Sequence, residues 1–203
     1  MPVPEYAPAR LPGDPLARLD IDVLERNIAR MAAAARSGGF ALRPHAKTHK
    51  CPQIAARQLA MGASGLTVAT IREAEAFADA GVTDLFIACP LWPDADKARR
   101  LRRLAEVTAL RVGVESAGGA RHLGRSLRGA ARPVEVLVEI DSGHHRTGAG
   151  LDVVGVFTFP GHGYGHDAHA RERAARDEES ALAQAASSWT PAARSSPPTS
   201  RPG

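Results

Sequence analysis

Long apolar runs, cysteines and aromatic residues are all scarce in this chain of 203 residues, and each shortage excludes a class of protein. No stretch reaches the roughly 18 consecutive apolar residues of a membrane-spanning helix, so we expect no membrane partner. Two cysteines, Cys51 and Cys89, are too few for a disulfide framework, which favours a reducing compartment. The first twenty residues also lack the apolar core of a secretory signal, and we therefore expect a cytoplasmic protein.

The charge balance gives little support to a nucleic-acid partner. The net charge is only +4, although the sequence pI is about 9.6, and the excess comes from arginine in a lysine-poor and alanine-rich chain. One predicted helix carries a basic run, formed by Lys97, Arg99, Arg100, Arg102 and Arg103. A run of this kind is typical of a solvated outer face, so we expect no nucleic-acid binding.

Strand-like and helix-like segments alternate between a proline-rich lead (1–14) and a tail (189–203) with the composition of a disordered segment. Apolar spacing predicts helices over 22–36, 52–61 and 168–188, and the spacings Asp22–Glu25 and Thr70–Glu73 match capping boxes at helix starts. The predicted strand centres lie near 44, 68, 87, 111, 137 and 156. This alternation indicates a parallel sheet with helical crossovers.

Such a sheet is either open and doubly wound or closed as a (β/α)8 barrel. No G-x-G-x-x-G follows the first strand, which removes the main support for a dinucleotide-binding sheet and favours the barrel. A full barrel needs about 250 residues, and the eleven residues between Asp141 and Val153 are too few for a helical crossover. We therefore predict an α/β fold over 15–188: an incomplete (β/α)8 TIM-type barrel with about six parallel strands, lacking its last two strand–helix units.

The segment Arg43-Pro-His-Ala-Lys-Thr-His-Lys50 is the most informative part of the chain. Extended over residues 40–48, it would place Arg43, His45, Lys47 and His49 on one face, with Lys47 near the carboxyl end of the strand, where barrel active sites lie. A desolvated amine at that place suits a Schiff base. Spacing alone favours the alternative, in which Lys47 and Lys50 lie on an exposed loop.

The motif RPHAKTHK resembles the first-strand motif of the D-threonine aldolase and D-serine dehydratase group, within the alanine racemase N-terminal-domain superfamily. The resemblance covers about residues 15–185, through GLTVATIREAEAFADAGVTDLFIA, VEVLVEIDSGHHRTGA and GVFTFPGHGYGH. It implies that Lys47 holds pyridoxal 5'-phosphate as a Schiff base, with His45 beside it. It also implies that Arg146, in Asp141–Gly148, contacts the phenolic-oxygen side of the cofactor, and that His162 and Tyr164 are cofactor neighbours. The adjacent pair His144 and His145 has no metal-site spacing, so we predict no metal ligands here.

The implied function is a pyridoxal-phosphate-dependent D-amino-acid lyase or aldolase, of the D-threonine aldolase or D-serine dehydratase type, acting on a small-molecule D-amino acid. The resembled group also uses a divalent metal, held by a histidine and a cysteine of a C-terminal β-domain that this sequence lacks. The phosphate cradle near the seventh and eighth strands is missing too, and a homodimer of the family type would use the missing domain. Two alternatives stay open: a non-enzymatic pyridoxal-phosphate-binding protein and a truncated fragment without function. A racemase would need a tyrosine from the same missing domain.

Overall fold

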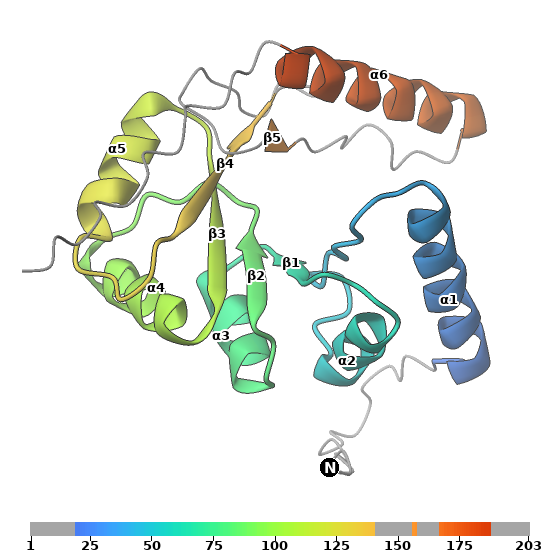
Figure 1. Ribbon diagram of the computed structural model, residues 1–203, viewed down its shortest axis with the longest axis horizontal. Coiled ribbons are helices and arrows are strands. Elements are labelled where there is room, and N and C mark those ends of the chain that lie inside the picture. Colours follow the sequence, from blue (N-terminus) through green and yellow to red (C-terminus); the bar gives the residue numbers. More distant parts are fainter. Residues whose placement is uncertain (1–18, 141–155, 158–166, 188–203) are drawn as a thin grey trace, which may run out of the picture.

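A parallel β-sheet forms the centre of the computed structural model, which describes residues 19–140, 156–157 and 167–187 (Figure 1). Its strand order along the sheet is the order in the chain: β1 (Leu66–Val68), β2 (Asp84–Ile87), β3 (Ala109–Val114), β4 (Glu135–Glu139) and β5 (Val156–Phe157). All four strand pairs are parallel. A doubly wound sheet reverses its strand order at a switch point, and the described strands contain no such reversal. The sheet is therefore singly wound over this part of the chain.

Helices connect the strands and flank the sheet. They are α1 (Ile21–Ser37), α2 (Pro52–Ala60), α3 (Ile71–Asp79), α4 (Ala95–Val107), α5 (Ala117–Ser126) and α6 (Ala168–Ser187). Figure 1 shows α1 and α2 beside the β1 edge of the sheet, whereas α6 lies near β5. Among the described residues, no helix combines the length and the apolar character needed to cross a bilayer.

Successive strand residues alternate between two faces of the sheet, and one face forms the core. The face that packs against the helices presents buried aliphatic side chains: Leu66, Val68, Leu85, Ile87, Leu110, Val112, Val114 and Val138. They pack with residues from α3, α4 and α5: Ile71, Ala74, Phe77, Leu101, Leu104, Ala105 and Leu123. Full burial of each such side chain contributes about 1.5–3 kcal/mol, so this layer is the main source of stability.

The opposite face, which we call the charged face, is defined by the register Thr67–Phe86–Arg111–Glu135 across β1 to β4. Asp84 lies on this face, two residues before Phe86, and accepts hydrogen bonds from Arg43 and Arg111. Arg111 also pairs with Glu135, with 2.7 Å between Nε and Oε2. These ion pairs connect the segment before β1 to three strands of the sheet.

The predicted element order is confirmed over the described residues, except that the strand predicted near 44 is present only as an isolated bridge between His45 and Thr67. Two further local predictions are wrong. Helix α1 begins at Ile21 rather than at 22, because Asp20 and not Asp22 is the N-cap and accepts a hydrogen bond from Val23 N at 3.0 Å. The extended run predicted for 40–48 ends at Ala46, because Lys50 N donates to Ala46 O at 2.9 Å and closes a turn over the intervening residues. The lead, the tail and the connection from Asp141 to Val153 lie outside the described residues.

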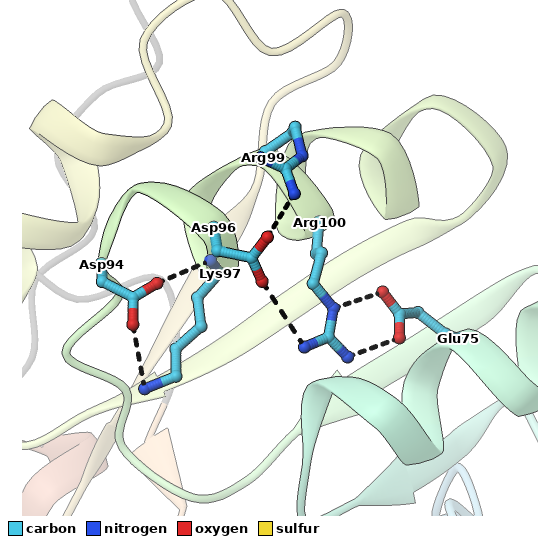
Figure 2. A network of polar contacts seen from close by, with 6 residues as sticks. All are labelled: Glu75, Asp94, Asp96, Lys97, Arg99 and Arg100. Atoms are coloured by element: carbon cyan, nitrogen blue, oxygen red, sulfur yellow. Dashed lines mark hydrogen bonds and ion pairs between the residues drawn. The ribbon is translucent and has the colours of Figure 1, made fainter.

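An ion-pair network joins α3 to α4 on the outer surface (Figure 2). Asp94 caps α4 by accepting a hydrogen bond from Lys97 N at 2.8 Å. Arg100 forms two hydrogen bonds with Glu75 of α3, at 2.7 Å from Nε and 2.6 Å from Nη2. The six residues of the network are Glu75, Asp94, Asp96, Lys97, Arg99 and Arg100. Much of the basic run on α4 is thus paired with carboxylates of this chain.

Candidate functional site

Lys47 lies in a turn that follows residues 44–46, the extended segment beside β1 that we call the first strand position. Ala46 N donates to Thr67 O and Thr67 N donates to Pro44 O, both at 2.8 Å, so residues 44–46 extend the sheet in parallel beyond β1. Ala46 is fully buried, and Lys47 directly after it is half-buried. The backbone of Lys47 is therefore held at the carboxyl edge of a parallel sheet, the edge where α/β folds bind ligands.

His45 lies beside this lysine and has a lowered pKa. Its register partner is Thr67, which places it on the charged face, and its Nδ1 accepts a hydrogen bond from Lys47 N at 3.4 Å. Burial is the main cause of the lowered pKa and the positive charge of Lys47 adds to it, while Glu73 opposes it. The imidazole is therefore neutral near pH 7, and with Nδ1 accepting, its proton resides on Nε2.

Glu73, near the start of α3, approaches the same turn from the other side. Its side chain is only 12% exposed and forms an ion pair with Lys50, with 3.1 Å between Oε1 and Nζ. Its Oε2 accepts a hydrogen bond from Ala69 N at 2.8 Å. Burial alone would raise the pKa of Glu73, but the Ala69 amide and the Lys50 ammonium outweigh it, so the pKa lies below the ordinary value.

An apolar groove of about 250 Å³ opens beside His45, between α1, α2 and the segment before β1. It is lined by Ile28, Met31, Ala32, Leu42, Pro44, His45 and Gln58. Pockets that enclose small molecules usually have volumes of roughly 300–1,000 Å³. The groove is thus smaller than a complete cofactor pocket, and His45 is the residue that it shares with the surroundings of Lys47.

Two of the predicted site residues, Lys47 and His45, are brought together by the structure. Arg146, His162 and Tyr164 lie outside the described residues, and their proposed contacts stay predictions. Glu73 was not among the predicted site residues, although the Thr70–Glu73 capping box indicated that its carboxylate lies at the start of a helix directly after β1. Thr70 Oγ1 accepts from Glu73 N at 3.1 Å as predicted, and the Glu73 carboxylate also accepts from Ala69 N, one residue before the cap.

His49 is the other histidine of the motif, and it packs towards the core rather than beside Lys47. Its ring meets Phe77 of α3 edge-on, with 6.4 Å between the centroids, and its Nδ1 accepts a hydrogen bond from Cys51 N. Burial lowers the pKa of His49. Within the described residues, no group of three or more His, Cys, Asp or Glu side chains is arranged to hold a metal ion.

Comparison with known proteins places these features in a family context. Residues 19–197 match the family model of the alanine racemase N-terminal domain. An uncharacterized protein of Mycobacterium tuberculosis is 44% identical over 135 residues, which cover 57% of this chain and 79% of that protein. A D-threonine aldolase of Arthrobacter sp is 40% identical over 154 residues, which cover 72% of this chain and 40% of that enzyme.

The solved D-threo-3-hydroxyaspartate dehydratase from Delftia sp. HT23 has a closely similar fold. It matches with a TM-score of 0.73 and 34% sequence identity, over 83% of this chain and 49% of that chain. This chain thus spans half of the length, or less, of the two enzymes compared here.

Proposed function

Because the chain belongs to the family of the alanine racemase N-terminal domain, we propose that it is a pyridoxal-phosphate-dependent lyase or aldolase acting on D-amino acids, with Lys47 as the residue that binds the cofactor. The family's enzymes use pyridoxal phosphate. The singly wound sheet supports the further proposal that it forms one side of a (β/α)8 barrel. The observation that carries the proposal is the half-buried lysine that directly follows the segment 44–46 beside β1, with its amide hydrogen-bonded to His45.

The described residues fit the aldehyde side of this cofactor. A primary amine is the group that captures an aldehyde, and Lys47 is one of only three lysines in the chain. Of the three, Lys47 is the one that directly follows Ala46, the last residue bonded to the sheet ahead of the turn. We propose that Lys47 holds the cofactor through Nζ and that Arg146, His162 and Tyr164 contact it from segments outside the described residues.

The chemistry follows from the cofactor and from what this chain places around it. When bound, pyridoxal phosphate withdraws electrons from the α-carbon of an attached amino acid. His45 lies next to this lysine along the chain, and its Nδ1 accepts a hydrogen bond from the Lys47 amide. The imidazole orients the lysine backbone and adds no positive charge next to the amine. In this role Lys47 Nζ would hold or deliver a proton on its own side of the substrate.

The names of the relatives point to a substrate class. D-threonine and D-threo-3-hydroxyaspartate share the D configuration at the α-carbon and a hydroxyl group on the next carbon. We propose a D-amino acid with a 3-hydroxyl group as the substrate. An aldolase would break the bond between the α- and β-carbons and release an aldehyde, whereas a dehydratase would eliminate water and release ammonia.

The experiment has two steps, and the first concerns the cofactor. Purified protein incubated with pyridoxal phosphate and then desalted should keep a visible absorbance band. Lys47→Ala should lose the band, while the matched control Lys97→Ala, which removes a lysine from the surface of α4, should keep it. A band that persists in Lys47→Ala would contradict the assignment of the lysine.

The second step measures aldehyde and ammonia released from D-threonine and from D-threo-3-hydroxyaspartate with an added divalent metal, against the L enantiomers as controls. Release from the D enantiomers alone would support the lyase or aldolase. Cofactor capture without any release would favour the alternative of a non-enzymatic pyridoxal-phosphate-binding protein. A wild-type chain that captures no cofactor would favour the alternative of a fragment without function.

A further inference from the structure

We propose that the ion pair between Lys50 and Glu73 is a clamp that positions Lys47 for capture of an aldehyde cofactor. This inference rests on the proposed function, because it assigns a role to the clamp only if Lys47 is the capturing amine. Lys50 and Glu73 would act through the turn that carries Lys47, without touching the cofactor, so both are positioning residues.

The geometry fixes the turn at both of its ends. At its start, Ala46 is fully buried and hydrogen-bonded to Thr67 O in the sheet. At its end, the Lys50 ammonium reaches the Glu73 carboxylate, and the Lys50 amide donates to Ala46 O at 2.9 Å. Lys47 lies between these two attachment points, so its backbone has little freedom to move while the pair is formed.

Glu73 is itself rigidly held, which is what a clamp requires. Its amide is bonded to Thr70 Oγ1, and its carboxylate accepts from Ala69 N, directly after the end of β1. The carboxylate is thus tied to the carboxyl end of the neighbouring strand. The ion pair transmits this fixed position to the turn that follows the first strand position.

The backbone of Lys50 provides a second, independent observation. Its φ of 48° makes it the only residue other than glycine with a positive φ among the described residues. A lysine gains nothing from this conformation, which glycine adopts without cost. Strain of this kind persists where the surroundings impose it and is concentrated at functional sites. A lysine is used here because its side chain reaches Glu73, which a glycine cannot do.

The clamp contributes little to overall stability by comparison. The Lys50 side chain is 66% exposed, and exposed ion pairs have small net effects on unfolding. A role confined to stability therefore predicts a small change in melting temperature and no change in cofactor capture. A positioning role predicts the same small change in melting temperature together with weaker cofactor capture, so the two roles differ in the capture measurement.

The test compares Lys50→Met, Lys50→Arg and wild type by titration with pyridoxal phosphate. Loss of the ammonium in Lys50→Met should raise the apparent Kd and lower the rate of borohydride-trapped adduct formation at Lys47 by roughly fivefold, the factor equivalent to the upper range of an exposed ion pair. Lys50→Arg, which keeps the charge, should restore most of both values. Lys97→Met is the matched control, because it breaks a lysine–carboxylate pair on α4 and should leave capture unchanged.

The outcomes distinguish this proposal from the proposed function. If wild type captures the cofactor at Lys47 and Lys50→Met captures it equally well, the clamp is wrong and the proposed function stands. If wild type captures no cofactor, or captures it at another residue, the proposed function fails and the clamp fails with it. Thermal melts of every variant identify any that are unfolded. If Lys50→Met is unfolded, the same titration of Glu73→Gln, which keeps an acceptor for Ala69 N, tests the clamp instead: weakened capture supports it and unchanged capture contradicts it.

Discussion

Replacing Asp84 with asparagine removes the one negative charge that two arginines of the charged face share. The Asp84 carboxylate accepts from Arg43 at 2.8 and 3.0 Å and from Arg111 at 2.6 Å, and its side chain is 26% exposed. A buried hydrogen bond to a charged group contributes roughly 1.5–3 kcal/mol, and an exposed ion pair about 0–1 kcal/mol. Asparagine keeps one acceptor oxygen, and Arg111 keeps Glu135, so we expect a loss of about 2 kcal/mol between these limits.

For a domain of this size, about 2–4 °C of melting temperature is lost per kcal/mol, so the expected fall is about 4–8 °C. The matched control is Asp96→Asn, at an ion pair on α4 in which the Asp96 side chain is 55% exposed (Figure 2). It should show only the small change typical of surface substitutions. Calorimetry or a circular-dichroism melt measures both variants. An Asp84→Asn melting temperature equal to that of Asp96→Asn would refute the claim that the charged face is held by this shared carboxylate.

Two further predictions concern the same region. Gly65→Ala should lower the free energy of unfolding by about 1–3 kcal/mol, because its Cβ would lie 2.3 Å from Arg43 Nη1 and 2.7 Å from Asp84 O. The control is Gly124→Ala in α5, where a Cβ meets nothing within 4 Å, and it should be neutral or stabilising. Equal urea midpoints for the two variants would contradict this explanation. The pKa values of His45 and His49 are lowered by burial, so the unfolded chain binds more protons just below the ordinary histidine pKa of about 6.5. The free energy of unfolding should therefore fall from about pH 7 to pH 5, and a wild-type slope retained by His45→Gln/His49→Gln in urea titrations would show that other groups cause it.

The strand and helix order was predictable because the local signals agree with the global fold. Capping residues, apolar spacing and glycine-ended segments indicated α1 to α6 and the strand centres, and the parallel sheet follows from their alternation. Helix starts were less certain, since Asp20 and Asp22 are both suitable N-caps. The backbone conformation decides between them: Asp20 is extended and accepts from Val23 N, whereas Asp22 already lies inside the helix.

The site was predictable in its residue types but not in its geometry. Alternation along an extended strand placed Lys47 on the face of Arg43, whereas the structure ends the strand at Ala46 and holds Lys47 in a turn. That turn depends on a positive φ at Lys50 and on a pair with Glu73, which is 23 positions later in the sequence. A contact of this kind depends on how β1 and α3 pack, and no local pattern in the sequence carries that information.

Peptide mapping after borohydride reduction in the presence of pyridoxal phosphate tests the central claim most directly. The chain has three lysines, Lys47, Lys50 and Lys97, so mass spectrometry assigns a reduced adduct without ambiguity. The account predicts an adduct on Lys47 alone at stoichiometric cofactor. An adduct distributed equally over the three lysines, or found on Lys50 in place of Lys47, would contradict it.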